Sequence, residues 1–146
     1  MNLPQPVIDI YPDGSYAVLK EVYHVSAWPV SVWICADFAY DGASIPALAQ
    51  PYIGGPWDPR RLPAATVHDW LYASHAVPKW LADLVFGYLL YRNGHGLRRS
   101  IVDWYAVSRF GHDAWYSHLP DEQALTLGQG NITFFEPTTK HRKEQP

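Results

Sequence analysis

The amino-acid sequence predicts an α+β fold, with a small N-terminal antiparallel sheet, a Gly/Pro-rich loop and three helices. Up to residue 40, short β-rich segments alternate with turn residues. After residue 61, longer segments repeat apolar residues at helical spacing. A chain of 146 residues is expected to form one domain with one core. We expect that domain to span residues 1–136, and the polar residues 137–146 to be a disordered tail.

Antiparallel strands are predicted within residues 6–40. The segments VIDIY and SYAVLK flank Pro12-Asp13-Gly14, a turn in which Pro fixes φ and Gly accepts a positive φ. The segments EVYHVSAW and VSVWICADF follow, separated by Pro29. Apolar and polar residues alternate in part along these segments, so we expect one face of the sheet to be covered.

Residues 41–61 form the predicted loop, and a loop of this length inside a compact domain is commonly functional. Helices are predicted within residues 62–118. The first begins near Pro63, and the second begins after Pro78 and ends at Asn93-Gly94.

The third predicted helix covers RSIVDWYAVSRFGHDAWY and is amphipathic. The residues that share one of its faces are Ile101, Trp104, Tyr105 and Ser108. The segment NITFFEP, near the C-terminus, is a candidate for a late strand.

Charge and composition argue against several classes of protein. The net charge is −3 and no basic block precedes KHRKEQ, so we expect no nucleic-acid partner. No secretory signal and no run of about 18 apolar residues is visible, so we expect synthesis in the cytoplasm without a signal peptide. The chain has 7 Trp and 10 Tyr, residues that build cores and also suit a membrane–water interface.

The first two predicted helices are expected to bring His68 and Asp83 together. His68 and Tyr72 share one stripe of the first helix, and Asp83 lies on the inner stripe of the second. His68 lies about nine residues before the turn and Asp83 about six after it. The offset is therefore only about 4–5 Å at a rise of ~1.5 Å per residue. We expect a hydrogen-bonded His68–Asp83 dyad, with Tyr72 able to hold the same carboxylate.

This arrangement suits acid–base chemistry. A carboxylate that accepts from one ring nitrogen fixes the tautomer and leaves the other nitrogen as a base. Asp69 points about 100° away on the helix, where it could bind Ca²⁺ together with backbone carbonyls of the loop. The alternative is that His68, Asp69 and Asp83 only satisfy one another's hydrogen bonds and specify the fold.

Three ordered motifs, DGASIP (41–46), HDWLY (68–72) and ADLVF (82–86), closely resemble an uncharacterised family of small phage and prophage proteins. That family is domain-of-unknown-function family 1353, and the resemblance covers roughly residues 35–115. It implies a phage or prophage origin and brings no established activity.

The helical part is also similar to the catalytic core of secreted phospholipases A₂, above all the short viral-capsid form. In that form a Y-x-G-x-G-type calcium loop precedes H-D-x-x-Y on one helix and an A-D pair on the next. This chain has YIGGP (52–56), HDWLY and AD in the same order, although its loop reads G-G-P.

The phospholipase resemblance implies a role for each matching residue. His68 would activate water, Asp69 would bind Ca²⁺, and Tyr72 and Asp83 would orient the histidine. The resemblance also implies that the calcium site is completed by backbone carbonyls around Ile53, Gly54 and Gly55.

The DGASIP motif has a structural and a functional interpretation. Asp41-Gly42 is a turn pair, and Ser44 is suited to cap a short helix. Alternatively, Asp41 or Ser44 joins the dyad as a second carboxylate or as an oxyanion donor.

A zinc site is a further alternative, because the chain has seven histidines. The common zinc motifs H-E-x-x-H and C-x-x-C are both missing from the sequence, which weakens this alternative. His68 and His75 lie two turns apart on one helical face, and His95, His112 and His118 lie on or near the third helix.

The sequence thus supports a phage-encoded, hydrolase-like protein, with Ca²⁺-dependent, phospholipase A₂-like ester hydrolysis on the host envelope as its most specific form. Its partners would be membrane lipid or the host envelope. The alternatives are a non-enzymatic virion or tail-morphogenesis protein, which would bind other virion proteins, and a zinc-dependent cell-wall peptidase.

Overall fold

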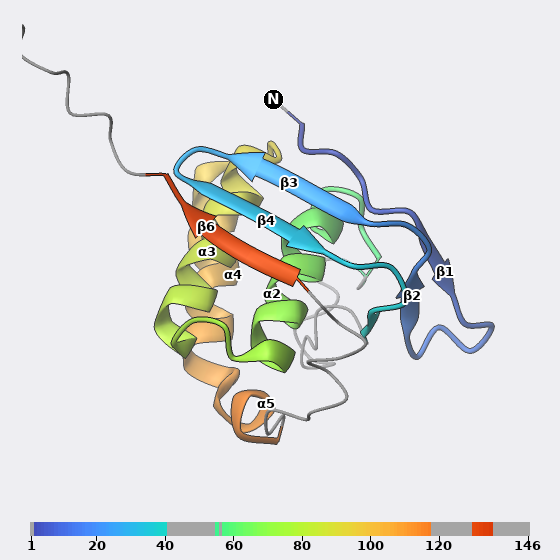
Figure 1. The fold of residues 1–146 in the computed structure, drawn as a ribbon. Coiled ribbons are helices and arrows are strands. Elements are labelled where there is room, and N and C mark those ends of the chain that lie inside the picture. Colours follow the sequence, from blue (N-terminus) through green and yellow to red (C-terminus); the bar gives the residue numbers. More distant parts are fainter. Residues whose placement is uncertain (1, 41–54, 56, 118–129, 136–146) are drawn as a thin grey trace, which may run out of the picture.

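The fold is known from a computed structural model that describes residues 2–40, 55, 57–117 and 130–135. Figure 1 shows one antiparallel sheet lying across a group of helices, with a second small sheet to one side. The predicted α+β class is confirmed. The sheets hold residues from both ends of the described chain, because the C-terminal strand returns to the N-terminal part.

The smaller sheet has the strand order β1-β2-β5 and is antiparallel throughout. The predicted turn lies between its first two strands, and Gly14 adopts a φ of 71°, which a residue without a Cβ accepts readily. Its strands are β1 (Ile8–Ile10), β2 (Ala17–Leu19) and β5 (Ala39–Tyr40).

The larger sheet consists of β3 (Tyr23–Ala27), β4 (Val30–Ile34) and β6 (Gly130–Phe134), with β4 in the centre. Buried and exposed residues alternate strictly along β3, so one face of this sheet is covered, as predicted. The first four residues of the NITFFEP segment, Asn131–Phe134, lie in the late strand that its composition suggested. Gly130 is needed there, because a Cβ would lie 2.5 Å from the carbonyl oxygen of Trp33.

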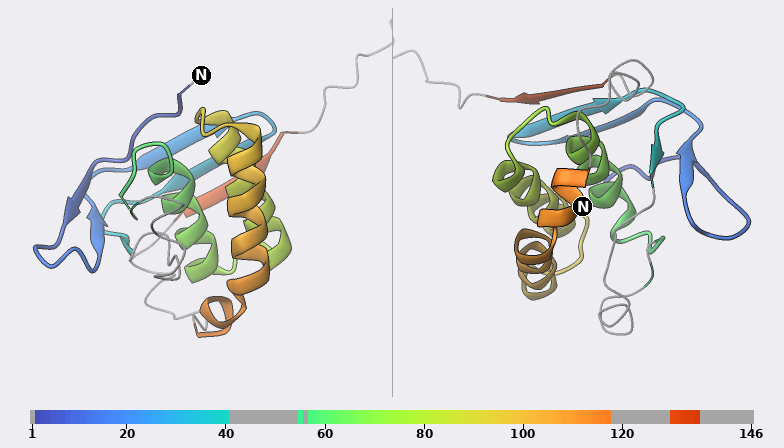
Figure 2. Two further views of the ribbon diagram at one scale, coloured as in Figure 1. Left: turned by 180° about the vertical axis from the view of Figure 1, so that it is seen from behind. Right: turned by 90° about the horizontal axis from the view of Figure 1, so that it is seen from below.

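The described helices are α2 (Leu62–Ser74), α3 (Lys79–Arg92), α4 (Leu97–Phe110) and α5 (His112–Ser117). The first two agree with the predicted helices in extent. Figures 1 and 2 show α2 and α3 beneath the larger sheet and α4 outside them. The core lies between the sheet and the inner helices, where Val25 and Ile34 join one cluster with Val67, Leu71 and Leu89.

The third predicted helix is divided at Gly111 into α4 and α5. The face of α4 that carries Ile101 and Tyr105 points outward, since these side chains are 51% and 59% exposed, whereas Ser100 and Asp103 are buried. Asp103 faces inward because a buried cation, Arg61, meets it there.

No helix among the described residues has both the length and the apolar composition that a membrane span requires.

Candidate active site between two antiparallel helices

The candidate site is built around the buried carboxylate of Asp83, in the second turn of α3. The first two turns of α3 face the last two turns of α2, because a short connection joins the helices. His68 Nε2 lies 2.9 Å from Asp83 Oδ1, so the contact predicted from the helical hairpin is present. The Tyr72 hydroxyl donates to the same oxygen at 2.6 Å. Lys79 Nζ donates to the other oxygen, Oδ2, at 2.7 Å.

Lys79 also joins the site to the next helix. Its ammonium group donates to the carbonyl oxygens of Val107 and Ser108, both at 3.3 Å, near the C-terminal end of α4. A cation is favourable at a helix C-terminus because the carbonyl groups there carry partial negative charge. Lys79 therefore ties Asp83 and α4 together. Its spacing of four residues from Asp83 was visible in the sequence as an ion pair on one helix face.

The protonation states of His68 and Asp83 follow from their surroundings. The hydrogen bonds from His68, Lys79 and Tyr72 outweigh burial and hold the pKa of Asp83 below its usual value. Burial lowers the pKa of His68, although the Asp83 charge opposes this. At neutral pH the pair is therefore a carboxylate beside a neutral imidazole. An ionised carboxylate can only accept, so Nε2 carries the proton and Nδ1 carries the lone pair.

The lone pair of His68 lies on the side of Asp69. Nδ1 is 4.0 Å from Asp69 Oδ1, which is too long for a direct hydrogen bond. The ring of His68 also lies against those of Tyr72 and Phe86, with centroids 4.1 and 4.8 Å away. These contacts and the bond to Asp83 hold the imidazole in one orientation. The arrangement therefore presents an oriented, neutral base beside an acidic side chain.

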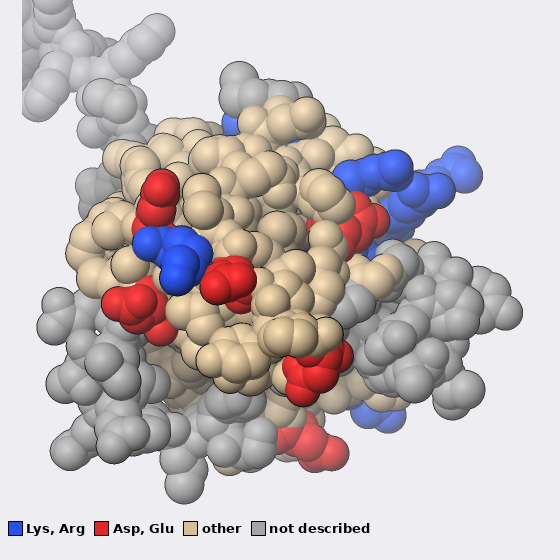
Figure 3. Space-filling model, turned by 90° about the vertical axis from the view of Figure 1, so that its right-hand side faces the viewer, with Lys and Arg blue, Asp and Glu red and all other residues tan. Residues whose placement is uncertain are grey.

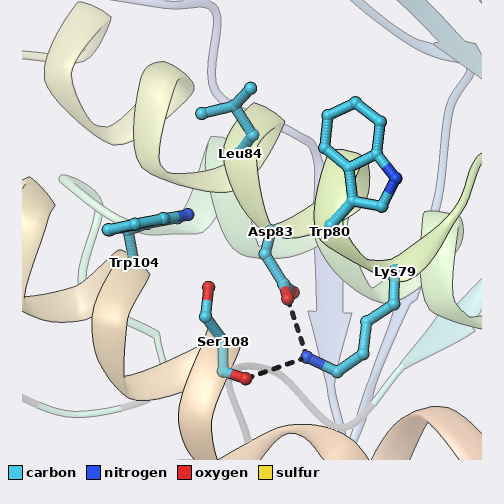
Figure 4. Close-up of a pocket in the computed structure, with 6 residues that line it drawn as sticks. All are labelled: Lys79, Trp80, Asp83, Leu84, Trp104 and Ser108. Carbon is cyan, nitrogen blue, oxygen red and sulfur yellow. Dashed lines mark hydrogen bonds and ion pairs between the residues drawn. The ribbon is translucent and has the colours of Figure 1, made fainter.

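A pocket of about 510 Å³ opens on the other side of Asp83. Figure 4 shows Trp80 and Trp104 on either side of the carboxylate, with Lys79 below it. Leu84 and Ser108 complete the described lining, and His68 does not belong to it. The pocket therefore reaches the carboxylate that orients the base and does not reach the base itself.

Five predicted site residues belong to the segment predicted as a loop. Gly55 is exposed. Ile53, Gly54, Asp41 and Ser44 lie outside the described residues.

Among the histidines behind the zinc alternative, His118 lies outside the described residues, and the others do not come together. His75 stacks on Trp115 with a centroid distance of 3.9 Å, whereas His95 lies beside Asp103. Within the described ranges, no three His, Cys, Asp or Glu side chains are grouped so that they could hold a metal ion.

A second buried charged cluster was missed by sequence reasoning. Arg61 Nη2 lies 2.5 Å from Asp103 Oδ2, and His95 Nε2 lies 3.0 Å from the same oxygen. Burial is the main cause that lowers the pKa of His95. Arg61 directly precedes α2, His95 lies in the α3–α4 turn and Asp103 lies in α4. The DGASIP, HDWLY and ADLVF motifs contain none of the three.

Comparisons with known proteins give a family and one curated relative. The family model described as "protein of unknown function (DUF1353)" matches residues 17–107. This range includes His68, Tyr72, Lys79 and Asp83, which we call the Asp83 cluster. An uncharacterised protein of Sinorhizobium fredii (strain NBRC 101917 / NGR234), y4iH, is 33% identical over 119 residues. The match covers 80% of this chain and 49% of the relative, so the chain spans about half the length of that protein. No solved structure matches the chain.

Proposed function

The chain belongs to the DUF1353 family of proteins of unknown function, and we propose that it is a hydrolase whose general base is His68. The observation that carries the proposal is the contact between His68 Nε2 and Asp83 Oδ1, which leaves Nδ1 as the acceptor. Tyr72 and Lys79 hold the carboxylate in place. A base with a lowered pKa stays unprotonated at and somewhat below neutral pH, which general-base catalysis requires.

The proposed reaction is the hydrolysis of a lipid ester of the host envelope. His68 Nδ1 takes a proton from a water molecule while the water oxygen bonds to the ester carbonyl carbon. The tetrahedral intermediate then loses the alcohol oxygen, which receives the proton from the imidazolium. The products are a carboxylic acid and an alcohol. Asp83 stabilises the imidazolium that forms between these steps, as a paired carboxylate does in other hydrolases.

Ca²⁺ is the cofactor proposed for this reaction. The proposed donors, the Asp69 carboxylate and the carbonyls of Ile53, Gly54 and Gly55, are all oxygen atoms, which Ca²⁺ prefers. A bound Ca²⁺ would polarise the ester carbonyl. Asp69 directly follows the base on α2, so the helix itself sets the distance between the two groups.

The test compares His68→Gln with His24→Gln in an assay of phospholipid hydrolysis. Both substitutions replace a histidine with an amide, but His24 is exposed on β3 and bonds only Ser31 among the described residues. We expect His68→Gln to lower kcat by about 10²–10⁴-fold, and His24→Gln to leave it unchanged. A wild-type protein that hydrolyses no phospholipid with Ca²⁺ present would contradict the proposal.

The calcium part has its own test, because ligand binding to the folded state raises the melting temperature. We expect millimolar Ca²⁺ to raise the Tm and the hydrolysis rate of the wild type, and Asp69→Asn to abolish both effects. Asp113→Asn is the matched control, since Asp113 is exposed on α5. A Tm that does not change on adding Ca²⁺ would count against Asp69 as a ligand.

A non-enzymatic role, as a virion or morphogenesis protein, is the second candidate. It is favoured by the three donors that satisfy Asp83 from two helices, since such a cluster also specifies how the helices pack. This alternative predicts no hydrolysis by the wild type. It also predicts that His68→Gln lowers the free energy of unfolding by about 1–3 kcal/mol when the hydrogen bond to Asp83 is lost.

A further inference from the structure

The outer surface of α3 and α4 is apolar over an extended area. Leu97, Ile101 and Trp104 follow one another at helical spacing along α4, and all three are exposed. Trp80 and Leu84 of α3 are 66% and 50% exposed and line the same pocket as Trp104. We call this surface the α3–α4 face; its apolar residues are Trp80, Leu84, Leu97, Ile101, Trp104 and Tyr105. A contiguous exposed apolar surface marks an interaction site.

Every exposed charge on these two helices is positive. Arg98 and Arg99 lie at the beginning of α4 and Arg109 at its end, and all three are exposed. The acids of the two helices, Asp83 and Asp103, are both buried and paired with cations. The chain as a whole has a net charge of −3, so this face has the opposite sign to the protein.

The side of the molecule that carries β1 and β2 provides a contrast. Figure 3 shows acidic and basic side chains next to one another on that side. Its surface pair, Lys20 and Asp9, has one charge of each sign at a distance of 4.0 Å. The positive α3–α4 face is therefore a local feature of two helices.

We propose that the α3–α4 face docks on an anionic lipid bilayer. A helix with Trp and Tyr on its apolar side and Arg at its ends lies in the plane of the interface, with the apolar groups in the acyl boundary. The arginines meet the lipid phosphates, and their aliphatic stems cover apolar surface. This inference deepens the proposed function and rests on it for the substrate. The pocket on this face is lined by Asp83, the carboxylate that orients the proposed base.

The positive charge of the α3–α4 face favours a bilayer over a second copy of the chain as the partner that covers it. An antiparallel pairing of two α4 helices would bring Arg98 and Arg99 of one copy towards Arg109 of the other. A parallel pairing would bring each arginine towards its equivalent. Like charges at an interface cost free energy, whereas anionic lipid attracts all three arginines.

The experiment is cosedimentation of the full chain with two kinds of vesicle, one of phosphatidylcholine alone and one of phosphatidylcholine mixed with phosphatidylglycerol. We expect tight binding to the mixed vesicles, weak binding to neutral vesicles, and release by high salt. Equal binding to both kinds of vesicle, or none to either, would overturn the proposal.

Matched variants locate the binding face. We expect Ile101→Gln to weaken binding to mixed vesicles about tenfold, and Val22→Gln to have no effect. The two side chains are 51% and 52% exposed, but Val22 lies outside the face. Arg98→Gln is expected to weaken binding about fivefold, and the exposed Lys20→Gln to leave it unchanged.

Two further measurements separate docking on a bilayer from self-association, and lipid binding from lipid hydrolysis. A wild type that sediments as a dimer, with Ile101→Gln a monomer, would assign the face to a second copy and overturn the proposal. His68→Gln is expected to bind mixed vesicles as the wild type does, because His68 is buried away from the face. If the wild type binds these vesicles and hydrolyses no lipid, the proposed function fails and the docking face stands.

Discussion

At the scale of single residues, the molecule accommodates a buried carboxylate by surrounding it with donors. Burying a charge costs several kcal/mol unless it is paired and hydrogen-bonded. Asp83 is 1% exposed and receives hydrogen bonds from an imidazole, a phenol and an ammonium group. The carboxylate in turn fixes the tautomer of His68, because it accepts from Nε2. One set of contacts therefore meets a structural requirement and would also serve the proposed catalysis.

The contact between His68 and Asp83 was predictable because an α-helix has a fixed rise and the connection between α2 and α3 is short. Counting residues on either side of the turn was then enough. The full role of Lys79 was not predictable, since its second set of partners lies on α4. The proposed partners of Asp69 lie partly outside the described residues, so that part stays a prediction.

We predict that acid destabilises the protein partly through His68. Its pKa is lowered in the folded state, mainly by burial. As the pH falls below about 6.5, the unfolded chain binds a proton that the folded chain does not, so the free energy of unfolding falls. The slope from one such group is at most about 1.4 kcal/mol per pH unit.

Urea unfolding of the wild type and of His68→Gln at several pH values between about 7 and 5 measures this effect. The wild type should lose more stability than the variant over this range. The pKa of His95 is also lowered, so His95 adds to the pH dependence of the free energy of unfolding. That contribution is present in both proteins and cancels when their pH curves are subtracted. Parallel pH curves for the two proteins would show that the folded state does not perturb His68.

At the scale of elements, α4 departs most from the usual relation between apolar periodicity and burial. Its periodicity predicted a helix, and in most surface helices the apolar side faces the core. The structure turns Ser100 and Asp103 inward instead, because Arg61, 42 residues earlier in the chain, needs a buried partner. Periodicity within one segment contains no information about a partner that distant.

The packing of α3 on α4 depends on Gly87. A Cβ at this position would lie 2.8 Å from Cβ of Trp104, closer than real contacts allow. Ala is a better helix former than Gly by about 1 kcal/mol, but overpacking costs about 1–3 kcal/mol. We therefore predict that Gly87→Ala lowers the free energy of unfolding, as measured by urea denaturation.

Gly55→Ala is the control for that substitution, since no atom lies within 4 Å of a Cβ built there. It should leave the stability almost unchanged. A Gly87→Ala protein as stable as the wild type would mean that α3 and α4 separate easily, and the pocket between them would then have no fixed shape.

At the scale of the whole molecule, the cluster of Arg61, His95 and Asp103 fixes α4 to the rest of the fold. Arg61 is 2% exposed and precedes α2, whereas Asp103 is 5% exposed and lies in the middle of α4. Asn93 adds a link to the N-terminus, because its side chain accepts from the backbone N–H of Leu3. The outer helix is thus attached by charged and polar contacts as well as by apolar packing.

We predict that Asp103→Asn lowers the free energy of unfolding by about 3–5 kcal/mol, because Arg61 is then a buried cation without a counter-charge. Asp9→Asn removes a carboxylate from an exposed pair whose side chains are 56% and 72% exposed, and it should have no measurable effect. Chemical denaturation of the two variants tests this contrast. Equal effects would mean that the buried cluster contributes no more than a surface ion pair.

The return of β6 to the edge of β4 also determines when the fold can be completed. Residues 130–134 pair with residues 30–34, so about a hundred residues must be synthesised between the two strands. Contacts between distant segments form slowly, since closing a long loop costs chain entropy. Until β6 arrives, β4 has an open edge that can pair with other chains. A product that stops after α5 would therefore be prone to aggregate, even though all the residues of the Asp83 cluster are already present.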